Sequence, residues 1–191
     1  MNGPETEGVG GELDRLCELA NVGAGHAAGA LARLLGCTVR MDPPRVRVSA
    51  PGAEEGGELG IATSGVFFEV QGGIGGTLGV LFPHPARAAL LETLIGDPDP
   101  HSEDAESALR EVGNMLASHA LSAVADLIGA RVLPSLPVLA EQAAGAVLRS
   151  HQAGGEGLRI ESRLVDDAGG LRSLLVWLPE LPAREAPASS L

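Results

Sequence analysis

The chain repeats itself at a spacing of 93 residues, and this feature favours folds that are built from two similar halves. Without a gap, 12 of the 29 positions from 16 to 44 carry the same residue as the position 93 further along. Alanine richness inflates this number, but it does not explain the matched Glu, Asn, His, Gly and Pro pairs. Duplication of a helix–strand unit is the simplest origin, and it predicts a fold with pseudo-two-fold symmetry.

The composition favours a compact domain with small core side chains. The 191 residues suffice for one domain, and 45% of them are hydrophobic. Aromatic residues make up only 2% of the chain and tyrosine is absent. Ala, Leu, Val and Gly must therefore form a core in which helices and strands approach closely.

The formal net charge of −12 argues against two classes of partner. A field of this sign repels phosphate backbones and anionic lipids, so we expect no nucleic acid and no membrane as partners, and it favours a protein with a basic rim. The N-terminus lacks the features of a signal peptide, and no apolar run approaches the roughly 18 residues of a membrane span. Cys17 and Cys37 are too few for a disulfide framework. We therefore expect a cytoplasmic protein.

Periodicity and the positions of glycine and proline predict the organisation of the chain. We expect a single domain over residues 12–180 that consists of two repeats, about 12–96 and 103–180. A flexible lead, 1–11, and a disordered tail, 181–191, are expected to flank it.

Two long helices are expected at 12–35 and 103–128, because apolar residues recur there at steps of three and four and a glycine follows each run. The glycine cluster at 71–76 is typical of a hairpin connection. The other expected elements are an extended segment at 38–48, strands at about 59–70, 76–82, 130–134, 157–165 and 171–178, and helices at about 84–95 and 140–151.

The repeated polar residues share one face of each long helix. With Asp14 placed at zero on a helical wheel, Glu18 falls at about 40° and Asn21 at about 340°, whereas the apolar stripe centres near about 250°. Ser107, Glu111 and Asn114 occupy the same positions on the second helix. For a single copy, polar residues at this spacing usually mean a solvated face. Recurrence at the same register favours a function, as does asparagine in mid-helix, where it is a mediocre helix former.

A Glu and an Asn one turn apart are suited to positioning rather than to nucleophilic attack. No Ser or Cys stands beside a His in a triad-like pattern. An asparagine amide can orient a water molecule, and phosphoryl transfer depends largely on positioning and charge stabilisation. A neighbouring carboxylate can pair with a lysine of a partner and set the docking register.

Two other sites are disfavoured. The glycines of VGAGHAAG lie inside a helical pattern with no strand before them, which argues against a dinucleotide site, and GGIGGTLG lacks the Lys-Ser/Thr of a phosphate loop. The five histidines show no metal-ligand spacing. His26 and His119 fall at about 120° on the wheel, away from the core stripe.

These residues resemble the motif of the CheC family of chemotaxis phosphatases, whose pattern is Asp or Ser, three residues, Glu, two residues, Asn, then twenty-two residues and Pro. The first copy consists of Asp14, Glu18, Asn21 and Pro44. The second consists of Ser107, Glu111, Asn114 and Pro137. Both copies are complete, as in the two-site CheC type. The segment at 49–57 departs from the pattern, because it is shorter and looser than its counterpart after Pro137.

The resemblance implies an α/β fold with a six-stranded, mostly antiparallel sheet and two motif-bearing helices on the surface. It implies a phosphatase that hydrolyses the aspartyl-phosphate of a CheY-like receiver domain, with Glu18, Asn21, Glu111 and Asn114 as catalytic residues. No cofactor of its own is expected, because the receiver would supply Mg²⁺. A CheD-like deamidase is a further candidate partner, although no docking surface for it can be identified in the sequence. The alternative is a non-catalytic adaptor on the same fold, akin to the middle domain of the flagellar switch protein FliM.

Overall fold

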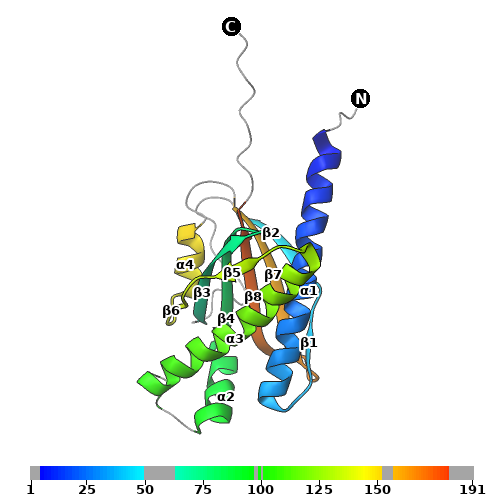
Figure 1. Ribbon diagram of the computed structural model, residues 1–191. Helices are drawn as coiled ribbons and strands as arrows, with labels where there is room; N and C mark the ends of the chain where they lie inside the picture. Colours follow the sequence, from blue (N-terminus) through cyan, green and yellow to red (C-terminus); the bar gives the residue numbers. More distant parts are fainter. Residues whose placement is uncertain (1–4, 50–62, 97–98, 100, 152–156, 181–191) are drawn as a thin grey trace.

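A computed structural model of the chain describes residues 5–49, 63–96, 99, 101–151 and 157–180 (Figure 1). The helices are α1 (Glu5–Leu35), α2 (His84–Ile95), α3 (Glu103–Ile128) and α4 (Ala144–His151). The strands are β1 (Val39–Met41), β2 (Arg45–Ser49), β3 (Thr63–Gly72), β4 (Gly76–Pro83), β5 (Val132–Pro134), β6 (Val138–Ala140), β7 (Gly157–Asp166) and β8 (Leu171–Pro179).

The eight described strands form one antiparallel sheet that is six strands wide, in the order β1-β7-β8-β4-β3-β5. The strand β2 continues the β1 edge along β7, and β6 continues the β5 edge along β3. Each edge is split just before a motif proline, Pro44 or Pro137, because proline cannot donate to a strand ladder. The predicted fold class is confirmed, with eight strand segments in place of six.

The two halves exchange strands. The short strands β1 and β2 of the first half pair with β7 of the second, and β5 and β6 of the second half pair with β3 of the first. The hairpins β3–β4 and β7–β8 meet in the centre, where Leu78 lies opposite Trp177 and Val80 opposite Leu175. The strands β4 and β8 are thus equivalent strands of the two halves and are related by an approximate two-fold axis. Each long helix packs beside the sheet.

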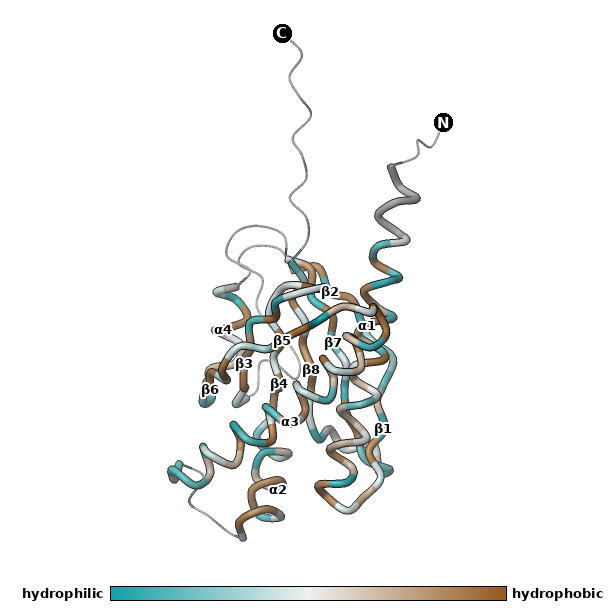
Figure 2. The backbone as a smooth tube through the Cα atoms, viewed as in Figure 1, coloured by the Kyte–Doolittle hydropathy of each residue, from teal (hydrophilic) through white to brown (hydrophobic). Residues whose placement is uncertain are grey.

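Both long helices cover the same face of the sheet, and α4 covers the other (Figure 1). Alternate residues of the central strands point to opposite faces, as the period of a strand requires. The hydrophobic residues of these strands are concentrated in the middle of the molecule (Figure 2). The face under α1 and α3 includes Val66, Phe68, Leu78, Val80, Phe82, Leu175 and Trp177, and the face under α4 includes Phe67, Leu81, Leu174, Val176 and Leu178.

Small residues allow the helices to pack closely. A Cβ atom at Gly23 of α1 would lie 3.3 Å from the carbonyl oxygen of Ala120 on α3. A Cβ atom at Gly113 would lie 2.7 Å from the Cβ atom of Val66 on β3. The alanine- and glycine-rich composition is therefore used at the contacts between α1, α3 and the sheet, as the sequence predicts.

Two sequence expectations need correction. The helix α1 begins at Glu5, so most of the lead that was expected to be flexible is helical. Glycine lowers helix propensity by about 1 kcal/mol per residue, which disfavours this extension without forbidding it. The expected helix at 140–151 begins only at Ala144, and residue 140 is instead the last residue of the unpredicted strand β6, which pairs with β3. The tail and most of the loose segment at 49–57 lie outside the described residues.

Candidate functional site

The two Glu/Asn pairs lie on the exposed sides of α1 and α3. Glu18 and Asn21 are exposed one turn apart on α1, and Glu111 and Asn114 are exposed at the equivalent positions of α3. The residues between them, Leu19 and Val112, are buried. Packing of the apolar stripe onto the sheet therefore turns each polar pair towards solvent, as the helical wheel predicts.

The residues one turn before each glutamate are also exposed. They are Asp14 on α1 and Ser107 on α3. Asp14 lies close enough to Cys17 to act on it: burial, and then the charge of Asp14, raises the pKa of the Cys17 thiol. A thiol with a raised pKa stays protonated at neutral pH, so Cys17 is poorly suited to act as a nucleophile beside this pair.

The motif prolines belong to the strand connections rather than to the helices. Pro44 and Pro137 are half-buried and directly precede β2 and β6. At each edge, the connection between the two short strands contains one residue more than the strand segment that faces it. In the first half, three residues separate Met41 from Arg45, whereas two residues separate their partners Leu164 and Glu161. The prolines thus mark equivalent breaks in the two edge ladders, which sequence spacing alone does not reveal.

The position one turn after each asparagine differs between the copies. Gly25 is exposed, and nothing lies within 4 Å of the place where its Cβ atom would be. The equivalent Ser118 is half-buried. Both are small, so another surface can approach either helix closely at this point.

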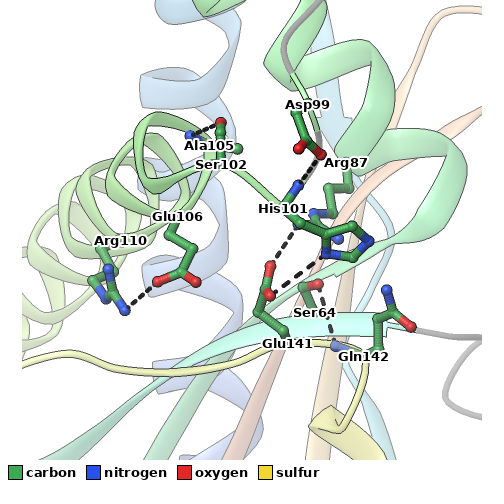
Figure 3. Close-up of polar contacts among 10 residues, drawn as sticks. All are labelled: Ser64, Arg87, Asp99, His101, Ser102, Ala105, Glu106, Arg110, Glu141 and Gln142. Atoms are coloured by element: carbon green, nitrogen blue, oxygen red, sulfur yellow. Dashed lines mark hydrogen bonds and ion pairs between the residues drawn. The ribbon is translucent and has the colours of Figure 1, made fainter.

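Residues that sequence reasoning did not identify hold the start of α3 in place (Figure 3). The buried Arg87 of α2 donates to Glu141, which follows β6, over 2.6 Å between Nη2 and Oε1. His101 Nδ1 lies 3.8 Å from Oε2 of the same carboxylate, and the His101 backbone N–H donates to Asp99. Ser102 then caps α3 by accepting from the N–H of Ala105. The contacts of Glu141 with Arg87 and His101 join segments far apart in sequence, whereas the Ser102 cap is local and a sequence pattern could have shown it.

The two cavities found among the described residues lie apart from the Glu/Asn pairs. An apolar cavity of about 40 Å³ lies beneath α1 and α3, beside Gly23, Ala120 and Trp177, and a second cavity of about 190 Å³ lies beside Leu31, Thr93 and Arg172. Neither is lined by a residue of the Glu/Asn pairs. Because both pairs are exposed, they are accessible to another molecule that approaches α1 or α3.

Metal binding and membrane spanning were also considered for the part of the chain that the structure describes. There, no three His, Cys, Asp or Glu side chains are grouped so that they could hold a metal ion. His26 and His119 are both exposed, on the side of their helices away from the core. Within the same residues, no helix combines the length and apolarity that are needed to cross a membrane.

Known proteins share this combination of fold and repeated motif. The model of the CheC-like family matches residues 12–48 and 105–140, which contain both copies of the motif. The CheY-P phosphatase CheC of Bacillus subtilis is 28% identical over an alignment of 189 positions, which covers 91% of this chain and 90% of that protein. The chain is therefore similar to CheC-like proteins in both motif-bearing segments.

Solved structures share the fold at low sequence identity. The chemotaxis protein CheX of Desulfovibrio desulfuricans superposes with a TM-score of 0.61 at 17% identity, over 85% of this chain and 99% of that one. CheX in the CheX–CheY–BeF₃–Mg²⁺ complex of Borrelia burgdorferi gives a TM-score of 0.60 at 12% identity, over 84% and 97% of the two chains.

Proposed function

We propose that this protein hydrolyses the aspartyl-phosphate of a CheY-like receiver domain in chemotaxis or two-component signalling. The observation that carries the proposal is the doubled Glu/Asn pair, exposed at equivalent positions of α1 and α3. The similarity to the CheY-P phosphatase CheC covers both copies and supports it. In the reaction, water attacks phosphorus, the bond from phosphorus to the carboxylate oxygen breaks, and inorganic phosphate leaves the regenerated aspartate.

In this proposal the two residues of each pair have different roles. Asn21 and Asn114 orient the attacking water, because an amide offers a donor and an acceptor in a fixed geometry. Glu18 and Glu111 pair with a lysine of the receiver and set the docking register. The phosphorylated aspartate and its Mg²⁺ belong to the receiver, which is why an exposed helix face can be sufficient. CheY crystallised with BeF₃ and Mg²⁺ in complex with CheX, a protein of the same fold, which supports this division.

The remaining motif residues support the pairs. We assign Asp14 and Ser107 to the edge of the docking face, because they are exposed one turn before the glutamates. We assign Pro44 and Pro137 a structural role in splitting the edge strands. A CheD-like deamidase stays a candidate second partner, and no feature of the described residues specifies where it would bind.

The decisive experiment measures phosphate release from each Mg²⁺-bound, phosphorylated receiver of the host, with and without this protein. We expect faster release from at least one receiver and little hydrolysis of a small phosphomonoester such as p-nitrophenyl phosphate. Brisk turnover of the phosphomonoester without a receiver would refute the proposal. Binding to a receiver without any acceleration would instead favour the adaptor function.

A further inference from the structure

The two copies of the site have the same Glu/Asn pair but different charges beside it. On the helical wheel with Asp14 at zero, a line of residues at about 100° runs beside the stripe that carries the motif residues. On α1 this line carries Arg15 and Arg33, which are both exposed. At the equivalent positions α3 carries Ala108 and the exposed Asp126. A partner that docks on the α1 stripe therefore meets positive charges beside it, whereas a partner that docks on the α3 stripe meets a negative charge.

The arginine side chains of α1 are available to a partner. A Cβ atom at Gly29 would lie 3.6 Å from Nη1 of Arg33, so the guanidinium reaches back along α1 towards Asn21. Among the described residues, neither Arg15 nor Arg33 forms an ion pair. Arg110 of α3 differs, because its Nη2 lies 2.8 Å from Glu106 and the pair neutralises itself (Figure 3).

The contrast holds over the whole exposed stripe when equal lengths of helix are compared. Between about 340° and 100° on the wheel, residues 11 to 35 carry the acids Asp14 and Glu18 together with the two arginines, so this stripe is neutral, and the exposed Glu12 lies beyond it at about 160°. From residue 104 to 128, the equivalent stripe carries Asp104, Glu111 and Asp126 and no cation. The chain as a whole is strongly acidic, so the balanced α1 face is the exception.

We infer that the α1 copy is the preferred docking site for the phosphorylated receiver and that Arg15, Arg33 and Asp126 determine this preference. The inference rests on the proposed function. Phosphorylation replaces the aspartate carboxylate, of charge −1, by an acyl phosphate of about −2, and the more acidic α3 stripe repels this added negative charge more than the α1 stripe does. The pairs themselves are the same, so the copies differ in KM and in salt dependence, with similar kcat.

The test uses the full-length protein with one working copy at a time and the receiver that gives the largest acceleration. Asn114→Ala leaves the α1 copy and Asn21→Ala leaves the α3 copy. We expect a KM two- to five-fold lower for the α1 copy, since exposed charge pairs have effects of about this size. Arg33→Asp should raise the KM of the α1 copy, and Asp126→Arg should lower that of the α3 copy, by similar factors. At 1 M salt, where the screening length is about 3 Å, these differences should disappear.

Arg149→Asp is the matched control, because it makes the same charge change on α4, which covers the opposite face of the sheet. It should change KM by less than about 1.5-fold. Equal KM values for the two copies at low salt, or an effect of Arg33→Asp no larger than that of Arg149→Asp, would overturn the inference while receiver dephosphorylation itself persists. If no receiver is dephosphorylated faster by the wild-type protein, the proposed function fails first, and the inference with it.

Discussion

At the scale of single residues, the exposed asparagines carry the proposed chemistry without contributing to the core. Asn21 and Asn114 are exposed, and the apolar side chains that hold α1 and α3 to the sheet lie on the other side of each helix. A side chain of this kind can be lost with little effect on folding. Activity and stability can therefore be separated at these two positions.

We predict that Asn21→Ala combined with Asn114→Ala lowers the receiver-dependent phosphatase rate by about a hundredfold or more, because an orienting amide acts mainly in the transition state. The free energy of unfolding should change by about 0.5 kcal/mol or less. Phosphate release and urea denaturation measure the two effects, with Glu92→Ala on the exposed side of α2 as the control. A near-normal rate in the double variant would exclude the assigned role.

At the scale of elements, two glycines in equivalent-looking helices have unequal surroundings. Gly113 of α3 faces Val66 of the sheet, whereas Gly25 of α1 faces open space. We predict that Gly113→Ala destabilises the protein by about 1 to 3 kcal/mol through overpacking. Gly25→Ala, the matched control, should stabilise it by up to about 1 kcal/mol, because alanine is the better helix former. Urea denaturation of both variants would show opposite signs, and equal shifts would contradict the packing at Gly113.

At the turn between β7 and β8, the pKa of Asp166 is lower than its ordinary value. The backbone N–H of Gly170, and then the charge of Arg172, hold the pKa of Asp166 below its ordinary value. Because its pKa is lower in the folded state, the ionised Asp166 stabilises the fold at pH values above about 3.9, the pKa of an aspartate in the unfolded chain. This contribution is lost as the pH falls through the lower pKa of the folded state.

We therefore predict that Asp166→Asn lowers the thermal unfolding midpoint at pH 7 and that the difference from wild type narrows below about pH 4. Asp167→Asn is the control, because its exposed carboxylate lies 3.6 Å from Arg40 and such surface pairs contribute little. Calorimetry across this pH range provides the measurement. A pH-independent difference would show that the charge of Asp166 is not its source.

At the scale of the whole molecule, the exchange of strands makes the halves depend on each other. The hairpin of each half receives its edge strands from the other half, and β4 and β8 pair at the centre. We predict that fragments 1–99 and 100–191, produced separately, do not fold and that mixing them restores a folded protein. Amide proton–nitrogen spectra would report this. A well-dispersed spectrum from either fragment alone would show that a half is an independent folding unit.

The sequence alone determined the features that depend on local periodicity. The bounds predicted for the helix at 103–128 agree with α3, and the wheel placed both Glu/Asn pairs on exposed faces, because an amphipathic helix reveals in its sequence which side is buried. Duplication indicated the symmetry, and the doubled motif indicated the CheC-like family, whose model matches both motif-bearing segments.

Only the tertiary structure decided how the halves interlock. The strand β6 has three residues and was not predicted, because so short a segment carries little periodicity and is specified by its partner β3. The contact of Arg87 with Glu141 joins positions 54 residues apart, and local sequence does not encode it. Strand exchange and long-range ion pairs are properties of elements brought together in space, so no local stretch of sequence specifies them.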